Sequence, residues 1–525
     1  MHRARNPVSS LDTRLIDALM HADAFDYPVT RIDLEETHIS WLILTDDFVY
    51  KIKKPVVLDF LDFGSLEKRK FYCEEEIRLN QPWAPGIYLD VVPITLEGGQ
   101  PRFAGGGETI EYAVRMRRFD QDMRLDRQLE LEKLTVQDMR ELASKIAVRH
   151  KDAPAVAPDR REKVHALTKA FMWDNFDALD GFVDSMTFDS LKDWTGNELG
   201  NTESLLLQRF DDGYVRDCHG DLHLANLVRL PDGVTTFDCI EFNEDFRHID
   251  VMCDIAFLLM DLVERRRHDL AAHFLNRYLE ATGDYGGVAV LSLFIVYRCL
   301  VRAKVAVIRS QEREDVSARN DDIDEACTYC DMALRQVADR VPVLVIMNGL
   351  SGSGKTFVAS QLMAALPAIR VRSDIERKRM SSLQESEASG SGVGEGIYAG
   401  QVSADVYARL FNSAKIILGA GHNVILDAAF LCESDRTAAF GVAEQCNCPS
   451  VIIEVTAAKK AMRERIRQRL DNEVDASEAN LDILEHQLAI AEALSPAERA
   501  RTSTCDNTES ADIEPVVKWI REKRS

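Results

Sequence analysis

Two stretches of the chain combine residue types and spacings that suit phosphate chemistry. The stretch DCHGDLHLANLVRLPDGVTTFDCIEF at 217–242 places histidines, acids and an asparagine around two short apolar runs. The stretch GLSGSGKT at 349–356 is rich in glycine and serine and ends in a lysine and a threonine. Glycine lets backbone N–H groups turn toward an anion, and lysine supplies a cation that can reach a phosphate. Both stretches therefore predict sites that handle phosphate groups.

The second stretch fits the P-loop pattern G-x4-G-K-[ST] at every fixed position. An apolar run, VLVIM, precedes it and an apolar-periodic run, FVASQLMAAL, follows it, so a strand should lead into the loop and a helix should leave it. In such a loop the lysine reaches the β- and γ-phosphates, and the threonine holds Mg2+. The residues predicted to contact the nucleotide are Gly349, Ser351, Gly352, Ser353, Gly354, Lys355 and Thr356.

Further charged residues follow the next predicted strands. Asp374 and Arg377 stand three apart at a helix start, where they could activate an acceptor hydroxyl and hold its anion, although an acid favoured by the helix dipole is the alternative. Asp427 ends the apolar run VILD, where a carboxylate for Mg2+ is expected. Arg465 and Arg469 stand four apart on a predicted helix, and they form either a lid over the triphosphate or a solvated helix face.

In the first stretch, His219, Asp221 and Asn226 fit the H-x-D-x4-N spacing of the protein-kinase catalytic loop. Asp221 is placed to accept the proton of an acceptor hydroxyl, and Asn226 can reach back to a metal ion. A second acid for the metal must end a following short strand. Asp238 does so after a Pro-Asp-Gly turn, with Glu241 as the substitute.

Two other interpretations of the first stretch stay open. A zinc site would use Cys218, His219 and His223, although no fourth ligand is assigned and the loop does not look helical. A polar hairpin without chemistry is the other alternative, and it would place the two aspartates and the asparagine at these spacings by accident.

The motifs of both halves resemble known families. HGDLHLANLV, followed by FDCIEFN and HIDVMCDIAFLL, resembles the aminoglycoside phosphotransferase family, which has a protein-kinase-like fold. GLSGSGKT, RSDIERKRM and VILDAAF look like the small P-loop kinases of the polynucleotide kinase, gluconate kinase and zeta-toxin type. Together they are similar to the bacterial two-domain arrangement called bifunctional aminoglycoside phosphotransferase/ATP-binding protein, which would cover nearly the whole chain.

The first resemblance implies the residues that hold the nucleotide phosphates. VYKIKKP places Lys51 on the third strand over the α- and β-phosphates, with Lys53 as the second candidate. The helix partner of Lys51 should be Glu74, Glu75 or Glu76, and Glu75 is the residue we select.

The first resemblance also implies a residue that supports the catalytic loop, and in one segment this sequence differs from the family pattern. The later aspartate of the family, matched by Asp254, should brace the catalytic loop. The segment THISWLILTDD, where the family covers the phosphates, contains no glycine, so nucleotide contact there should be weaker or built differently. The second resemblance implies Asp374 as the base toward the acceptor and Arg465 and Arg469 as lid residues. Because no N-K-x-D guanine signature occurs, ATP is the expected nucleotide.

These motifs require two kinds of fold. Residues 40–120 are strand-rich with one helix, and the helical pattern that follows completes what the resemblance implies to be a bilobal protein-kinase-like domain of the α+β class. From residue 342, strands near 368–372, 423–427 and 450–455 alternate with helices, which predicts an α/β P-loop NTPase domain with a parallel sheet. We predict a kinase-like half over 1–335 and a P-loop half over 341–525.

Composition limits the partners. The formal net charge of −23 argues against a general nucleic-acid binder, because such binding rests on basic surface. The apolar run at 288–308 is interrupted by Arg298, Arg302 and Lys304, which predicts a buried helix and no membrane span. No secretory signal is visible, and eleven cysteines in so long a chain do not make a disulfide scaffold, so the cytoplasm is the expected location.

The sequence therefore predicts an ATP-dependent phosphotransferase with two nucleotide sites, which uses ATP and Mg2+ to phosphorylate a hydroxyl group of a small molecule. One alternative is a regulatory ATP-binding protein in which one half is a non-catalytic sensor, and the glycine-free segment favours it. The other is a 5′-hydroxyl nucleic-acid kinase in the P-loop half, against which the acidic balance counts.

Overall fold

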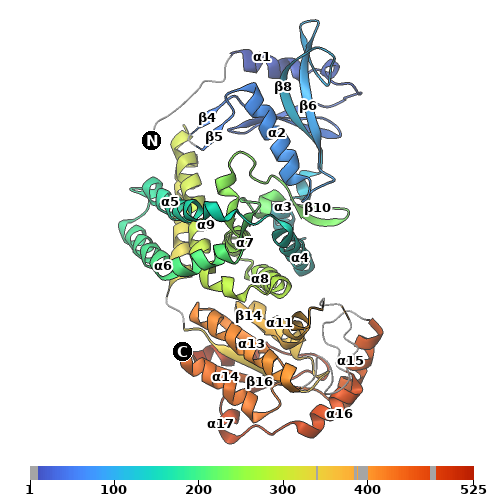
Figure 1. The fold of residues 1–525 in the computed structure, drawn as a ribbon, viewed down its shortest axis with the longest axis vertical. Coiled ribbons are helices and arrows are strands. Elements are labelled where there is room, and N and C mark those ends of the chain that lie inside the picture. Colours follow the sequence, from blue (N-terminus) through green and yellow to red (C-terminus); the bar gives the residue numbers. More distant parts are fainter. Residues whose placement is uncertain are drawn as a thin grey trace. The chain divides into compact units, whose positions relative to one another are not determined.

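In this computed structural model the chain forms two compact units. Figure 1 shows its helices and strands. The structure describes residues 10–58, 60–338, 341–383, 387, 400–472 and 480–524. The first unit comprises Met1–Thr168 and Leu207–Leu258, and the second comprises Lys169–Leu206 and Leu259–Ser525. The predicted boundary near 335–341 follows sequence motifs and differs from this division by contacts, so it stays a prediction.

An antiparallel sheet of six strands forms one part of the first unit. Its strands are β1 (Asp33–Glu36), β2 (Ser40–Leu44), β3 (Phe48–Lys53), β6 (Tyr88–Glu97), β7 (Gln100–Phe103) and β8 (Glu108–Arg117), in the order β1-β2-β3-β8-β6-β7. Trp41, Ile43 and Tyr50 belong to a core that also includes residues of helix α1 (Ser10–Leu19). Lys51 and Lys53 are two residues apart on β3 and therefore project from the same face.

Helices and short strands complete this unit. Helix α2 (Leu66–Asn80) packs on β6 and β8, after the small hairpin β4 (Val57–Leu58) and β5 (Leu61–Asp62). The helices that follow are η2 (Gln121–Met123), α3 (Leu125–Glu130) and α4 (Val136–Asp152). Helices α5 (Arg161–Leu179) and α6 (Ser185–Asp211) come next in the sequence, and most of both belongs to the second unit. Thr135 and Asp138 form a capping box at the start of α4, which fixes where this helix begins.

The stretch around the predicted catalytic loop is a series of short elements. These are β9 (Val215–Asp217), η4 (Leu224–Asn226), β10 (Leu227–Leu230), β11 (Gly233–Thr236), η5 (Glu244–Phe246), β12 (His248–Asp250) and α7 (Val251–Glu264). Strands β10 and β11 form an antiparallel hairpin in which Leu227 pairs with Thr236. The hairpin around the Pro-Asp-Gly turn is thus present as predicted.

Helices α8 (His268–Thr282), α9 (Val288–Glu312) and α10 (Val316–Val337), with η6 (Tyr285–Gly287), open the C-terminal part of the second unit. Helix α9 contains the apolar run at 288–308, and Arg298 within it is only 5% exposed, so the prediction of a buried helix is confirmed. No helix in the described part of the chain is long and apolar enough to cross a membrane.

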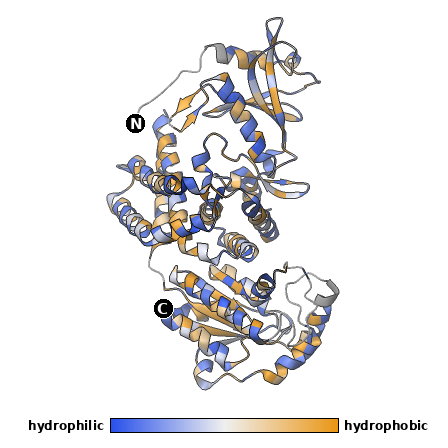
Figure 2. Ribbon diagram, viewed as in Figure 1, coloured by the Kyte–Doolittle hydropathy of each residue, from blue (hydrophilic) through white to orange (hydrophobic). Residues whose placement is uncertain are grey.

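A five-stranded parallel sheet follows. Its strands are β13 (Leu344–Asn348), β14 (Ala368–Arg372), β15 (Asn423–Asp427), β16 (Ser450–Thr456) and β17 (Thr502–Asp506), in the order β14-β15-β13-β16-β17. Every neighbouring pair is parallel. The strands are mostly hydrophobic, as expected of strands buried on both faces (Figure 2). The predicted parallel sheet and its strand positions are confirmed.

Helices cover both faces of this sheet. Helices α11 (Lys355–Ala365) and α18 (Glu514–Arg524) pack on one face, while α13 (Gly400–Gly419) and α14 (Glu433–Gln445) lie against β13, β14 and β15. The remaining helices are α12 (Ser373–Met380), α15 (Lys459–Asn472), α16 (Leu481–Ile490) and α17 (Pro496–Arg499). The carboxyl ends of parallel strands share one edge of a sheet, and this edge carries the predicted P-loop residues.

Candidate functional site

A network of alternating charges connects strand β3, helix α2 and the segment after β11. Lys51 Nζ lies 2.8 Å from Glu76 Oε1 and 2.8 Å from Asp238 Oδ1. Lys53 Nζ lies 2.7 Å from Glu76 Oε2 and also contacts Glu241. Glu76 is fully buried and joins the two lysines through its two separate oxygens. The predicted phosphate lysine and the predicted metal aspartate are thus brought together.

Burial and neighbouring charges have opposite effects on the pKa values in this network. Burial would lower the pKa of Lys51, but the carboxylates of Asp238 and Glu76 hold it well above its ordinary value. Burial likewise opposes ionisation of Glu76, yet Lys51 and Lys53 lower its pKa to about 2. Burial raises the pKa of Glu241, and the attraction of Lys53 offsets this only in part. Glu76 therefore stays ionised at the centre of this network.

The predicted partner of Lys51 is wrong by one residue. Glu75 forms its ion pair with Arg78, 2.7 Å from Oε2 to Nη2, and Glu74 lies on the exposed side of α2. Successive residues of a helix point about 100° apart, so only one of three neighbouring glutamates can face β3. In this helix that residue is Glu76.

Asp254, in helix α7, holds the predicted catalytic loop. The N–H groups of His219 and Gly220 donate to Asp254 Oδ2 and Oδ1 at 3.1 and 2.9 Å, and His150 Nε2 lies 3.1 Å from Oδ2. Gly220 has a φ of 85°, and a Cβ there would lie 2.9 Å from the carbonyl oxygen of Phe246. The expected bracing role of Asp254 is confirmed.

His219 orients the loop through both ring nitrogens. The N–H of Asp221 donates to Nδ1 at 3.3 Å, so the proton lies on Nε2, which donates to the carbonyl oxygen of Phe237 at 3.0 Å. Burial lowers the pKa of His219 and keeps the ring neutral. Because these bonds occupy both nitrogens, His219 does not serve as a zinc ligand, and the zinc interpretation is wrong for this residue.

The side chains of Asp221 and Asn226, both selected from the loop spacing, are in contact. Asn226 Nδ2 donates to Asp221 Oδ2 at 2.8 Å, and the Asp221 side chain is 37% exposed, so an acceptor can reach it. The N–H of Phe237 donates to the carbonyl oxygen of Asn226 at 3.0 Å. The β10–β11 hairpin therefore brings the segment of Asn226 beside that of Asp238 at its open end.

Asp238 itself has a left-handed backbone conformation, with a φ of 62°. Its N–H donates to the hydroxyl of Tyr88 at 3.0 Å, and the N–H of Cys239 donates to Asn80 Oδ1 at 2.8 Å. A conformation of this kind costs on the order of 1–3 kcal/mol and persists only where the surroundings hold it. Tyr88 and Asn80 provide that support from buried positions. Sequence reasoning missed both residues, because no motif marks them.

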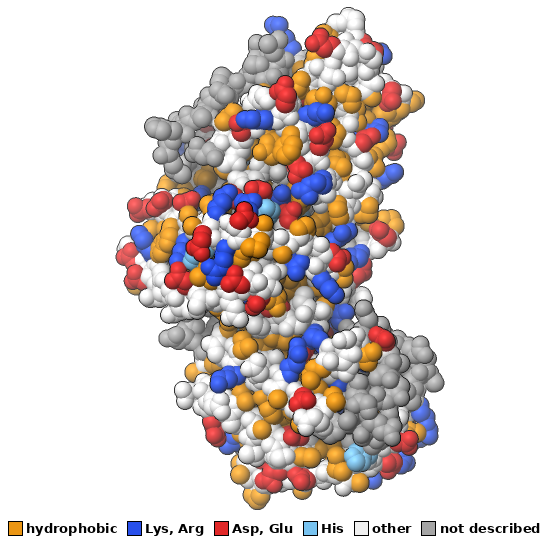
Figure 3. Space-filling model, in the orientation of Figure 1, with side chains coloured by type: hydrophobic (Ala, Val, Ile, Leu, Met, Phe, Trp, Pro, Cys, Tyr) orange, Lys and Arg blue, Asp and Glu red, His pale blue; other side chains and the backbone are white. Residues whose placement is uncertain are grey.

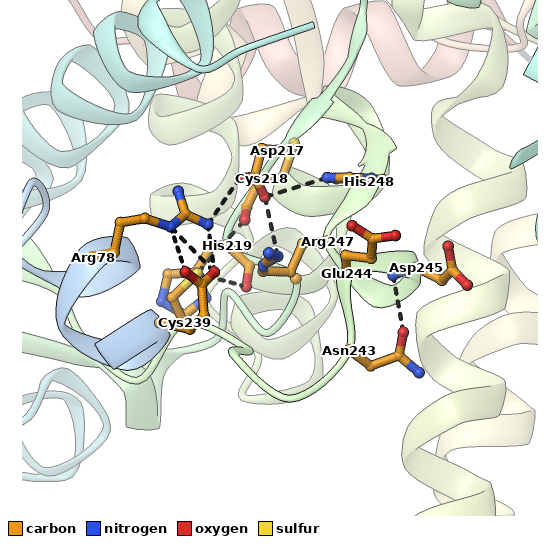
Figure 4. Close-up of polar contacts among 12 residues, drawn as sticks. Arg78, Asp217, Cys218, His219, Cys239, Asn243, Glu244, Asp245, Arg247 and His248 are labelled. Atoms are coloured by element: carbon orange, nitrogen blue, oxygen red, sulfur yellow. Dashed lines mark hydrogen bonds and ion pairs between the residues drawn. The ribbon is translucent and has the colours of Figure 1, made fainter. Parts of the chain in front are cut away.

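A second ion cluster lies at the base of the catalytic loop. Figure 4 shows Asp217 facing Arg78, Arg247 and His248, with separations of 3.9, 3.2 and 3.9 Å. Arg78 also holds Glu75, so the cluster ties helix α2 to the strand that leads into the loop. Sequence reasoning missed this cluster as well.

The turn between β1 and β2, which lacks glycine, is fixed by a lysine. Lys54 Nζ lies 2.6 Å from Glu36 Oε1 and contacts the carbonyl oxygen of Thr37. The ammonium also lies 5.5 Å from the ring centroid of Trp41. Side-chain contacts therefore hold this turn, and the weaker or differently built nucleotide contact expected there stays a prediction.

The P-loop after β13 has the glycine geometry that its motif predicts. Gly349, Gly352 and Gly354 have φ values of 148°, 80° and 91°, and a Cβ at each would lie 2.0 to 2.6 Å from a neighbouring atom. Helix α11 begins at Lys355, so its first N–H groups open toward the loop. Ser353 is buried, and within the described part of the chain its hydroxyl has no hydrogen-bond partner. These features fit a phosphate group.

The side chains of Thr356 and Asp427, both predicted to hold Mg2+, are in contact. Thr356 Oγ1 donates to Asp427 Oδ1 at 3.4 Å, and Asp427 is 5% exposed. Burial raises the pKa of Asp427, against the attraction of Arg370 and Arg372. Asp427 Oδ2 is buried and accepts no hydrogen bond from any described residue. Mg2+ prefers oxygen ligands, so an ion bound by these two side chains would supply the missing partner.

Asp374 and Arg377 lie at the same edge of the sheet. Arg372, the last residue of β14, pairs in register with Asp427, and α12 begins directly after it. Asp374 is therefore close to Asp427, and its role as the base toward the acceptor stays a prediction. Arg377 Nη1 donates to Ser403 Oγ at 3.1 Å, so the structure ties this arginine to helix α13.

Arg465 braces the P-loop from outside. Its Nη1 lies 3.3 Å from the carbonyl oxygen of Ser353, and its Nη2 lies 2.6 Å from that of Asn507. Carbonyl oxygens face away from the N–H groups that would bind phosphate, so Arg465 lies on the opposite side of the loop from those groups. The lid prediction instead placed Arg465 over the triphosphate. The side chain of Arg469 and residues 473–479 lie outside the described part, so their lid role stays a prediction.

Comparison with known proteins supports the P-loop assignment. Residues 344–494 match the family described as AAA domain. This part of the chain is a P-loop nucleotide domain. Uncharacterized proteins of Mycobacterium tuberculosis and Mycobacterium bovis are each 28% identical over 461 residues, which is 86% of this chain and 89% of theirs.

Solved structures give partial likenesses. Kti12 of Chaetomium thermophilum, in complex with ADP-AlF3, is 22% identical with a TM-score of 0.28, covering 35% of this chain and 99% of that chain. A choline/ethanolamine kinase family protein of Mesorhizobium loti is 11% identical with a TM-score of 0.39, covering 62% of this chain and 94% of that chain. The predicted fold class agrees with the sheets described above, and an ATP-dependent phosphotransferase is consistent with the family match.

Proposed function

We propose that the chain is an ATP- and Mg2+-dependent phosphotransferase with two nucleotide sites, and that its acceptor is a hydroxyl group of a small molecule. The observation that carries the proposal is Lys51, whose ammonium lies 2.8 Å from both Glu76 and Asp238. In kinase-type sites a lysine held by a helix glutamate contacts the nucleotide phosphates, and an aspartate beyond the catalytic loop holds the metal. A merely structural hairpin would not need this arrangement.

The transfer step in the kinase-like half uses residues that already face one another. The acceptor oxygen forms a bond to the γ-phosphorus, the bond from that phosphorus to the β–γ bridging oxygen breaks, and ADP leaves. The acceptor proton passes to the carboxylate of Asp221, which Asn226 orients through its 2.8 Å hydrogen bond. Lys51 neutralises phosphate charge, and Asn226 and Asp238 would hold Mg2+, which would supply further neutralisation when bound.

The P-loop half would perform the same chemistry with other parts. Lys355 and the N-terminus of α11 would bind the phosphates, while Thr356 and Asp427 would hold Mg2+. Asp374 accepts the acceptor proton in this half. Its position at the shared strand edge, near Asp427, supports this role.

A small acceptor fits the charge of the chain. The formal net charge is −23, and a nucleic acid would be repelled unless a basic groove compensated. On the face shown in Figure 3, acidic and basic side chains are intermixed. The net charge therefore favours a small molecule over a nucleic acid as the acceptor, and we propose the cytoplasm as the setting.

The test is a transfer screen with radiolabelled ATP and a broad panel of alcohols, run on the full chain. We expect Asp221→Ala to lower one set of transfers by roughly 100- to 10,000-fold, and Lys355→Ala to abolish the other. Asp232→Ala, in the exposed β10–β11 turn, and Lys415→Ala, exposed on α13, are the matched controls and should leave both sets unchanged. If neither site variant lowers transfer, the enzyme proposal fails. If only Lys355→Ala does, the kinase-like half is a sensor.

A further inference from the structure

A buried arginine connects the P-loop helix to helix α8 within the second unit. Arg370, in β14, is 2% exposed. Its Nη2 donates to Glu280 Oε1 of α8 at 2.6 Å, and its Nη1 donates to Ser360 Oγ of α11 at 2.6 Å. Nη1 also lies 3.3 Å from the carbonyl oxygen of Thr356. Arg370 thus links the backbone of Thr356, the predicted metal ligand, to helix α8, which precedes the P-loop half in the sequence.

The same arginine lies next to the metal position without bonding to it. Arg370 Nη1 is 4.0 Å and Arg372 Nε is 3.9 Å from Asp427 Oδ2, the buried oxygen that accepts no hydrogen bond from any described residue. Of the two arginines, Arg370 is the one that Glu280 contacts. A shift of about 1 Å would bring Arg370 and Asp427 to the length of a charge-assisted hydrogen bond. Such a bond would occupy the oxygen that Mg2+ needs. Something must therefore hold the guanidinium in its present position.

We propose that Glu280 is a positioning residue of the P-loop metal site. Its carboxylate holds Arg370 away from Asp427 and so keeps Asp427 Oδ2 available for Mg2+. Its negative charge also reduces the repulsion between the guanidinium and an incoming cation, an effect that is strong in a buried site. This inference rests on the proposed nucleotide function of the P-loop half.

The consequence is that the P-loop domain does not contain all the determinants of its own metal affinity. Glu280 lies 90 residues before Arg370 in the sequence and outside the matched range 344–494. Helix α8 packs against both α11 and β14, so a change in its position would move Glu280 relative to Arg370. The Mg2+ affinity of the P-loop site is thereby linked to the packing of α8.

The experiment is a Mg2+ titration of fluorescent-ATP binding to the full chain, in which the P-loop signal is the part lost in Lys355→Ala. Glu280→Gln should raise the Mg2+ concentration at half-saturation about tenfold, the usual effect of losing a residue behind a metal ligand. Binding in excess EDTA should not change, because metal-free nucleotide does not need Asp427. Adding Arg370→Met to Glu280→Gln should restore the wild-type midpoint.

The matched control is Glu498→Gln. It breaks another buried Arg–Glu pair of the same unit, with Arg436, at a comparable 2.5 Å. It should reduce thermal stability and leave the Mg2+ midpoint unchanged.

Three results would overturn the proposal: an unchanged midpoint in Glu280→Gln, an equal loss with and without Mg2+, or no restoration by Arg370→Met. Should Glu280→Gln fail to fold, Arg370→Met alone serves as the test. It removes one of the two guanidinium groups beside Asp427 Oδ2 and leaves Arg372 in place. The Mg2+ midpoint should therefore fall, and an unchanged or raised midpoint contradicts the proposal. Equal nucleotide binding by wild type and Lys355→Ala would instead refute the proposed function of the P-loop half, whatever Glu280→Gln does.

Discussion

Lys51 and Lys53 are two residues apart on β3 and share Glu76, but their surroundings differ. The Lys53 side chain is completely enclosed, between two buried carboxylates. The Lys51 side chain is 12% exposed, and its second partner, Asp238, is 45% exposed. Lys51 therefore faces the open side of the site, where a nucleotide would enter, whereas Lys53 belongs to the interior.

This difference predicts separable effects of substitution. Lys53→Met removes one partner of buried ion pairs and should lower the free energy of unfolding by about 3–5 kcal/mol. Lys51→Met should lower the free energy of unfolding less, because Lys53 still pairs with Glu76. It should, however, abolish ATP binding to the kinase-like half. Urea unfolding and nucleotide titration of both variants measure this, with Lys68→Met, an exposed surface pair, as the control. Equal stability losses would contradict the assignment.

His219 predicts a pH dependence of stability. Burial lowers its pKa in the folded chain, whereas the unfolded chain binds the proton near the ordinary pKa of about 6.5. Below that pH the unfolded state binds more protons, so the free energy of unfolding falls with falling pH, by at most about 1.4 kcal/mol per pH unit from this residue. His219→Gln, which can still donate to Phe237, should flatten the fall between pH 7 and 5.5 in urea unfolding. Parallel wild-type and variant curves would contradict this.

Residue identities were predictable where chemistry follows fixed local spacing. Asp221 and Asn226 meet because five residues separate them on one loop, and Thr356 meets Asp427 because parallel strands end at one edge. Glu76 was not predictable, since three neighbouring glutamates are locally equivalent. Only the rotation of α2 against β3, which depends on tertiary packing, selects one of them.

At the scale of elements, a side chain of helix α8 covers part of the β14 edge of the parallel sheet. β14 is the outermost strand on its side, and an open edge exposes unpaired backbone groups. Asn276 of α8 covers part of this edge: its Nδ2 donates to the carbonyl oxygen of Ala368 at 3.0 Å, and its Oδ1 accepts from the N–H of Arg370 at 2.6 Å. One side chain thus replaces a short length of neighbouring strand.

Asn276→Ala should be markedly destabilising, because it leaves two buried backbone groups without partners at about 1–3 kcal/mol each. The matched control is Asn175→Ala. Both asparagines are buried and donate to the carbonyl oxygen four residues earlier in their own helix, but only Asn276 also bonds to a strand. Denaturant unfolding of both variants separates the strand contribution. A similar loss in the two variants would show that the edge contact contributes little.

The strands and helices themselves were largely predictable, because hydrophobic periodicity and the motifs locate them. The contacts between α8 and β14 were not. Asn276 and Glu280 lie 94 and 90 residues from Arg370, and nothing in the local sequence of a helix indicates which distant strand it will meet. The same reason explains why Tyr88 was missed, since it supports Asp238 from 150 residues away.

At the scale of the whole molecule, these contacts explain why the second unit crosses the predicted domain boundary. Besides Lys169–Leu206, the second unit contains helices α8 to α10 together with the parallel sheet. Residues 341–525 alone would expose the β14 edge and leave Arg370 without Glu280. A buried charge that loses its partner is strongly destabilising, and an open sheet edge favours aggregation.

We therefore expect a fragment of residues 341–525 to be less stable than the same residues in the full chain. Hydrogen exchange at the central strands β13 and β15 measures this, because their amides report on opening of the sheet. Protection should fall in the fragment and recover when the fragment is extended back to residue 265, which adds α8, η6, α9 and α10 with both Asn276 and Glu280. If the short fragment protects these strands as well as the full chain does, α8 is only an appended neighbour. If the extension restores protection but Asn276→Ala within it removes the gain, the closure of the β14 edge is the part of α8 that matters for the sheet.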